Sequence, residues 1–250
     1  MRFLPALASF LVVSLPHFAS AQTPAAAPPP PPPGWIGSAG AGLALTQGNT
    51  DTSTLNAAYE VRRDTGGPIV FRSAGLLVRG EAQEVLTSDR LSLDARLERK
   101  LSARTSVFGA TQYLSDSFKS IDYLVSPTVG LTRSLVKSDR TELAADVGVG
   151  MVWEKNPGLE LQSDVALAAG QQFAHKLTTT TEIRERVAAL WKIDDFDDAL
   201  YTFGAGIAAA ITSATQMKVE FLNTYKARPP VASVQKNDIA VLVSFVYKFD

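Results

Sequence analysis

Cysteine is absent from the 250-residue chain. No disulfide framework can therefore stabilise the fold, and no cysteine is present to carry a lipoprotein anchor. No segment reaches 18 consecutive apolar residues, which argues against a transmembrane helix. Lys and Arg number 24 against 25 Asp and Glu, and this near-neutral balance argues against a nucleic-acid-binding protein.

The first 33 residues differ in composition from the rest. Residues 1–21 carry one basic residue, Arg2, followed by an apolar stretch that ends in Ala19, Ser20 and Ala21. This arrangement predicts a cleaved secretory signal peptide; a retained membrane anchor is the alternative, but the apolar stretch is short and broken by prolines. Residues 22–33 hold seven of the fourteen prolines. They predict an extended periplasmic linker that serves as a tether or contacts the cell wall.

From Trp35 to Phe249 the chain alternates apolar and polar residues in about twelve segments. A period of two, repeated behind a secretory leader, predicts an all-β fold: a transmembrane antiparallel up-and-down β-barrel of about 12 strands over residues 34–250. A soluble β-sandwich is the alternative architecture. The expected strands cover residues 35–46, 53–63, 69–80, a segment that includes 91–98, then 105–115, 121–134, 141–153, 159–173, 177–191, 199–212, 215–226 and 238–249.

The connections predict the orientation of the barrel. Short turns are expected near positions 66, 103, 138, 175 and 213, and mostly longer loops near 49, 84, 118, 156, 195 and 230. An outer-membrane barrel of a Gram-negative bacterium has short turns and both termini in the periplasm, so the longer loops should face outward. Aromatic residues expected near strand ends would form two girdles at the membrane surfaces: Trp35, Tyr113, Trp153, Trp191, Tyr201, Tyr225, Tyr247 and Phe249.

Three short motifs carry a family resemblance. They are the opening from Trp35 to Leu43 (WIGSAGAGL), the hairpin from Thr46 to Thr54 (TQGNTDTST) and the ending from Val243 to Phe249 (VSFVYKF). Over residues 34–250 the chain resembles a family of predicted outer-membrane proteins of unknown function described as salt-induced. The resemblance implies an outer-membrane barrel and supplies no catalytic residues. Recognition by the barrel-assembly machinery is expected through the aromatic ending, although Asp250 follows the final aromatic residue.

Enzyme chemistry finds little support. Apart from His17 in the expected leader, the one histidine is His175, placed in a short periplasmic turn with no neighbouring acid. A Ser-His dyad near the outer leaflet is therefore not expected, and we predict no catalytic residues and no cofactor. The acidic loop from Asp194 to Asp198 could hold a divalent cation that bridges lipopolysaccharide phosphates, or could be a solvated loop. Its spacing lacks the features of an EF-hand, so no metal ligands are assigned.

Charged residues at alternate strand positions are expected to face the lumen. Their mixed signs allow two interpretations: a weakly selective pore lining, or ion pairs that close a rigid barrel. The sequence therefore predicts a narrow passive channel for ions or small solutes, with a non-conducting envelope-stress barrel that binds lipopolysaccharide or cell wall as the alternative. Loops 81–88 and 227–237 are candidates to fold inward. The expected lumen residues are Glu60, Arg62, Asp94, Arg96, Glu98, Asp146, Asp164, Arg184, Lys218 and Glu220.

Overall fold

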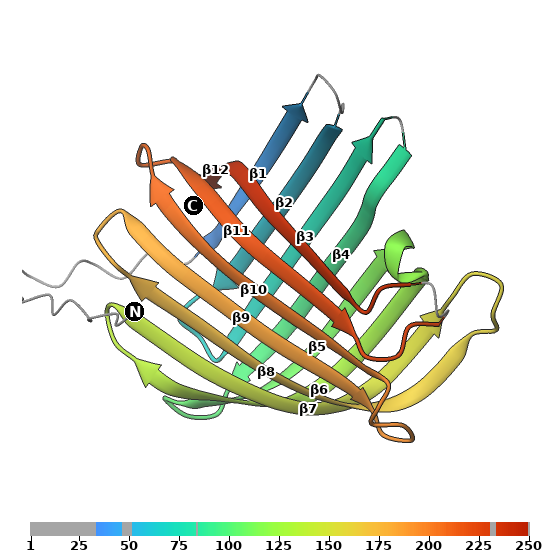
Figure 1. The fold of residues 1–250 in the computed structure, drawn as a ribbon. Helices are drawn as coiled ribbons and strands as arrows, with labels where there is room; N and C mark the ends of the chain where they lie inside the picture. Colours follow the sequence, from blue (N-terminus) through green and yellow to red (C-terminus); the bar gives the residue numbers. More distant parts are fainter. Residues whose placement is uncertain (1–33, 47–51, 84, 231–233, 250) are drawn as a thin grey trace, which may run out of the picture. The chain divides into compact units, whose positions relative to one another are not determined.

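Twelve strands form a closed antiparallel barrel in the computed structural model, which describes residues 34–46, 52–83, 85–230 and 234–249 (Figure 1). The predicted signal peptide and linker lie outside these residues. Within the same ranges no helix is long and apolar enough to span a membrane. The strands are β1 (Gly34–Thr46), β2 (Thr52–Asp64), β3 (Ile69–Ala82), β4 (Val85–Lys100), β5 (Thr105–Asp116), β6 (Ile121–Lys137), β7 (Thr141–Lys155), β8 (Gln162–Lys176), β9 (Thr181–Lys192), β10 (Ala199–Ala210), β11 (Thr215–Lys226) and β12 (Asn237–Phe249).

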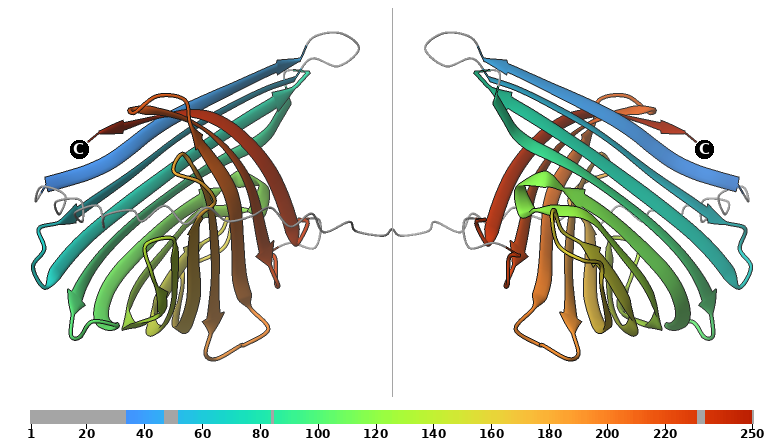
Figure 2. Two further views of the ribbon diagram at one scale, coloured as in Figure 1. Left: turned by 90° about the vertical axis from the view of Figure 1, so that its left-hand side faces the viewer. Right: turned by 90° about the vertical axis from the view of Figure 1, so that its right-hand side faces the viewer.

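Each strand pairs with its neighbours in sequence, and β1 pairs with β12 to close the barrel. The closing register joins Gly37–Ala41 to Phe245–Phe249, whereas β1 and β2 pair along the whole of Gly34–Thr46. Figure 2 shows this seam between the first and last strands from two sides. Closure satisfies backbone N–H and C=O groups that an open edge would leave unpaired in lipid at several kcal/mol each.

The barrel has two distinguishable ends, which we call the turn end and the loop end. The turn end carries the connections 65–68, 101–104, 138–140, 177–180 and 211–214, together with the start of β1 and the end of β12. The loop end carries the opposite connections, including the short 3-10 helix η1 (Ser117–Lys119). The expected alternation of connections is therefore present, and the predicted fold class is confirmed.

Several predicted boundaries were wrong. Strand β8 begins at Gln162 rather than at 159, because Gly158 adopts a φ of +73° in a turn where the Leu159 N–H donates to the Asn156 carbonyl. The same strand runs on to Lys176, so His175 lies in a strand and not in a turn. Segment 81–88 is not a loop that folds inward, because β3 continues to Ala82 and β4 starts at Val85.

Apolar side chains cover the outer surface of the barrel. Leu43, Val129, Val241 and Phe245 are each more than 60 % exposed, in the middle of strands whose alternate residues point inward. Such exposure would be unstable in water but suits hydrocarbon, which removes the apolar surface from solvent. The soluble-sandwich alternative is therefore wrong on two counts: the sheet closes on itself and its apolar face points outward.

The aromatic residues gather near both ends. At the turn end, Trp35 packs edge-on against Phe71 with ring centroids 5.9 Å apart. At the loop end, the Trp191 Nε1–H donates to the Tyr201 hydroxyl at 2.9 Å, and Tyr201 packs against Tyr225. These amphipathic rings therefore lie at the levels where lipid headgroups would meet a barrel of this height.

Candidate lumen site

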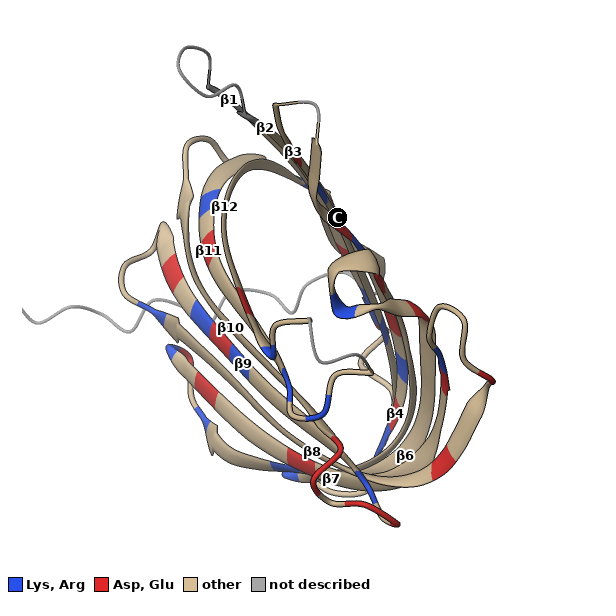
Figure 3. Cartoon of the chain, turned by 45° about the vertical axis from the view of Figure 1, so that its right-hand side comes forward, with Lys and Arg blue, Asp and Glu red and all other residues tan. Residues whose placement is uncertain are grey.

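Strand register places all ten of the expected lumen residues on one face of the sheet. Arg62 faces Arg72, which in turn faces Arg96, so the alternate residues of β2, β3 and β4 share that face. Cross-strand pairing from β6 to β11 places five more of these residues on the same face: Asp146, Asp164, Arg184, Lys218 and Glu220. Figure 3 shows basic and acidic residues distributed along these strands. Contacts between opposite walls show that this shared face is the inner one.

A layer of ion pairs crosses the lumen near the turn end. The Arg184 guanidinium of β9 donates to the Glu60 carboxylate of β2 at 3.1 Å, although four strands separate them along the shorter path around the barrel. Lys218 of β11 lies 3.7 Å from the same carboxylate and 3.0 Å from Glu220. Arg184 and Glu60 are about half exposed, so lumen water reaches this layer. We call Glu60, Glu182, Arg184, Lys218 and Glu220 the turn-end layer.

A second group of charges lies against the wall formed by β3 to β7. Arg72 and Arg96 both donate to the Glu98 carboxylate at 2.7 Å. The Arg96 guanidinium also lies 3.6 Å from the centroid of the Phe108 ring and 3.8 Å from Asp146. A cation stacked on an aromatic face and bonded to a carboxylate is strongly restrained, so this arginine is fixed along the wall.

The loop end contains a buried ion network that the sequence did not reveal. Glu154 accepts from Lys226 at 2.7 Å and lies 3.3 Å from Lys192, and all three side chains are at least 90 % buried. Lys192 also contacts Asp198 at 2.8 Å and Asp164 at 3.2 Å. Glu154 and Lys192 escaped the sequence analysis because the strands that carry them were predicted to end before them. Extending the period of two by one step would have placed both residues in the lumen.

Two further contacts draw the walls together at the loop end. The Arg90 guanidinium of β4 donates to the Thr224 hydroxyl of β11, on the opposite wall. The fully buried Lys119 of η1 donates to the Gln235 carbonyl and lies 3.0 Å from Asp238 of β12. Asp116 caps η1 by accepting from two backbone N–H groups, which orients the lysine. Arg90 continues the period of two one step before Ser92, whereas Lys119 carried no sequence signal; the contacts of both depend on strands distant in sequence.

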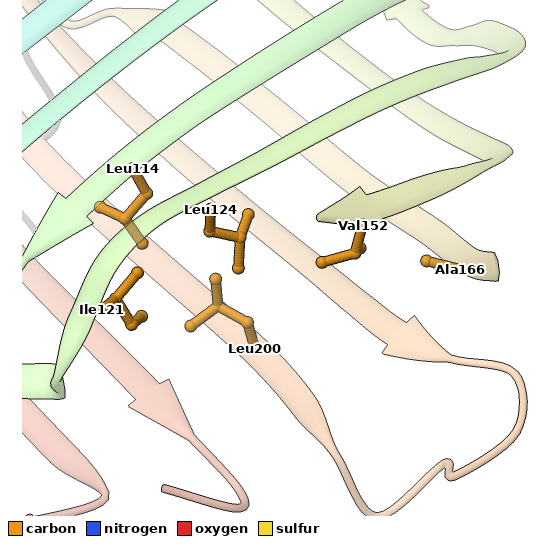
Figure 4. Close-up of a cluster of buried hydrophobic side chains, with 6 residues drawn as sticks. All are labelled: Leu114, Ile121, Leu124, Val152, Ala166 and Leu200. Atoms are coloured by element: carbon orange, nitrogen blue, oxygen red, sulfur yellow. The ribbon is translucent and has the colours of Figure 1, made fainter. Parts of the chain in front are cut away.

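An apolar cluster fills the inner face beside these contacts. Leu124 of β6 and Leu200 of β10 point toward one another, and Leu114 and Ile121 pack beside them (Figure 4). All four are at most 5 % exposed, so water is excluded from this cluster. The cluster also includes Val152 and Ala166. We call the cluster and the contacts of Arg90 and Lys119 together the loop-end layer.

A cavity of about 120 Å³ lies between the two layers. Leu190 and Leu200 bound it toward the loop end, and alanines of β5, β8 and β9 keep it open. Its polar lining comes from both walls of the barrel: Asp94, Arg96, Gln112, Ser126, Thr128, Asp146, Arg186 and Thr202. The middle of the lumen is therefore polar, with one layer on each side of it.

The acidic loop and the histidine make the following contacts. Asp198 contacts Lys192 and Lys226, and Asp195 binds Arg228. Within the ranges that the structure describes, no group of three His, Cys, Asp or Glu side chains could hold a metal ion. His175 shares a hydrogen bond of 2.8 Å with the Thr141 hydroxyl near the turn end.

A family model for proteins of unknown function, DUF481, matches residues 39–249. The chain belongs to the DUF481 family. No curated protein matches this DUF481 sequence. Among solved structures, the NanC porin is similar with a TM-score of 0.53 at 9 % identity, over 86 % of this chain and 100 % of that one. An outer membrane channel from Pseudomonas putida F1 is similar with a TM-score of 0.51 at 14 % identity, over 88 % of this chain and 96 % of that one. At such low identity these similarities show a shared barrel fold.

Proposed function

We propose that this DUF481 protein is an outer-membrane barrel that acts as a narrow passive channel for ions or small solutes. The observation that carries the proposal is the polar cavity in the middle of the lumen, lined by charged and hydrogen-bonding side chains from both walls. A barrel that served only as a scaffold could fill this space with packed apolar residues, as the loop-end layer does. A polar interior behind an apolar outer face is the arrangement that lets water-soluble species cross a membrane.

The proposed orientation places the turn end in the periplasm and the loop end outside. The start of β1 and the end of β12 both lie at the turn end, as in outer-membrane barrels with periplasmic termini. In this orientation the signal peptide would be removed, and the linker would tether the barrel in the periplasm or contact the cell wall. The loops would meet lipopolysaccharide, and the aromatic ending at Phe249 would be read by the barrel-assembly machinery.

In this conformation the channel would be closed. Conduction would require the Glu60–Arg184 contact to part at the turn end and the Leu124–Leu200 contact to part at the loop end. The same contacts favour a second candidate function, a non-conducting barrel that serves the envelope under stress. The salt-induced description of the family that the sequence resembles would suit that role. The two candidates differ in a measurable way, because only the first predicts that solutes cross.

A liposome-swelling assay tests the proposal. Vesicles containing the full-length protein would be placed in isosmotic solutions of small solutes, and swelling would report entry. We expect slow swelling for the native protein and faster swelling for Arg184→Gln, which removes the bridge to Glu60. Arg79→Gln is the matched control, because Arg79 pairs with Glu81 on the outer face. If folded native protein and Arg184→Gln both leave the vesicles impermeable, the channel proposal is wrong and the structural role stands.

A further inference from the structure

Most charged side chains of the inner face are paired, and two of the exceptions lie in the middle of the lumen. In both layers, in the buried ion network of the loop end and along the wall, the acidic and basic side chains described above contact one another within 4.0 Å. Asp94 of β4 and Arg186 of β9 border the cavity between the layers. For these two, the part of the chain that the structure describes supplies neither an ion pair nor a side-chain hydrogen bond.

The two unpaired charges come from different walls of the cavity. Asp94 faces Gln112 across the β4–β5 pairing, and Gln112 faces Ser126, so a carboxylate, an amide and a hydroxyl form one polar row. Arg186 lines the cavity from β9, where it pairs with Gln172 of β8 on one side and with Gly204 of β10 on the other. An anionic and a cationic group therefore border the same space without direct contact between them.

We propose that this cavity is a binding site for a small zwitterion of the amino-acid type, an inference that rests on the proposed channel function and names its solute class. The carboxylate of the solute would pair with Arg186 and its ammonium group with Asp94. Gln112 and Ser126 would offer hydrogen bonds beside the ammonium group. A water molecule occupies about 30 Å³ of liquid, so a cavity of about 120 Å³ has the volume of about four water molecules, which a small solute would displace.

Charge balance favours a zwitterion over a simple ion. A simple anion at Arg186 would leave the Asp94 carboxylate unpaired beside it, and a simple cation at Asp94 would leave the Arg186 guanidinium unpaired. Unpaired charges in confined sites are costly, because they lose hydration without gaining a partner. A solute that carries both charges satisfies both groups at once, while Arg96 and Asp146 at the edge of the cavity already neutralise each other.

Saturation-transfer NMR on the full-length protein folded in detergent tests this site, with glycine as the probe and acetate and methylammonium as single-charge comparisons. We expect saturable binding of glycine, with at least tenfold weaker binding of either single-charge probe. Asp94→Asn and Arg186→Gln should each weaken glycine binding by about tenfold or more, because each removes a charged hydrogen-bonding partner. The matched controls are Glu142→Gln and Lys248→Gln, which remove single charges from the inner face near the turn end and should leave binding unchanged.

The outcomes separate this inference from the channel proposal. Absence of glycine binding, or glycine binding that survives both cavity substitutions, would overturn the site even if the barrel conducts. If acetate binds as tightly as glycine, and if only Arg186→Gln abolishes acetate binding, the cavity is an anion site and the proposal of a zwitterion site is wrong. Glycine binding that needs both Asp94 and Arg186, in a barrel through which nothing permeates, would support the site and refute the channel.

Discussion

Replacing Lys192 with methionine should destabilise the barrel strongly. The Lys192 side chain is 9 % exposed, and its ammonium group lies 2.8 Å from Asp198, 3.2 Å from Asp164 and 3.3 Å from Glu154. Methionine matches the length of the side chain and removes its charge. Lys226 would still contact Glu154 and Asp198, but Asp164 would lose the ion pair that Lys192 supplies.

The expected cost follows from the burial of the partners. Removing one member of a buried ion pair costs about 3–5 kcal/mol, because the remaining charge is uncompensated. Arg79→Met is the matched control, since the Arg79–Glu81 pair is about half exposed and such pairs contribute about 0–1 kcal/mol.

The assay is equilibrium unfolding by urea in lipid vesicles, followed by tryptophan fluorescence. We expect Lys192→Met to lower the free energy of unfolding by about 3–5 kcal/mol and Arg79→Met by less than about 1 kcal/mol. Equal small losses for the two variants would show that the loop-end network is solvated and would refute the reasoning from burial.

Three further predictions concern the barrel wall. Val243→Arg, in the middle of β12 on the outer face, should lower the free energy of unfolding in vesicles by about 2–4 kcal/mol. The inward-facing Ser244→Arg should lower it clearly less, and equal costs would mean that the outer face does not meet lipid. Trp191→Phe should cost about 1 kcal/mol in the same assay through loss of the bond to the Tyr201 hydroxyl, and no cost would show that headgroups replace that bond. Cysteines introduced at Ala39 and Tyr247, in a chain without native cysteine, should cross-link under oxidation because these residues face each other across the closing seam. Mass spectrometry of the folded barrel would detect the link, and its absence would argue against this register.

The barrel could be predicted from the sequence because its physical signals are local. A period of two, as in Leu91–Glu98, records which face of each strand meets lipid, and the connections record the order of the strands. The boundaries of β8 and β9 could not be predicted well, because they depend on the Asn156–Leu159 turn and on the Thr178 hydroxyl, which accepts from the Thr181 N–H.

The site was only partly predictable for a related reason. Alternation identified inner-face candidates such as Glu60 and Arg184, but it could not show that these two meet across the lumen. That contact depends on how far apart the opposite walls lie, which no local pattern records. Lys119 illustrates the limit: a lysine in an expected outer loop is fully buried against Asp238, more than one hundred residues away.

Single-channel recording in planar bilayers is the measurement that tests the central claim most directly. The account predicts that the native protein shows rare, small, discrete conductance steps in KCl, and that Arg184→Gln opens more often because the bridge to Glu60 is gone. A folded barrel that stays silent in both forms would contradict the account and would leave a closed structural barrel in its place.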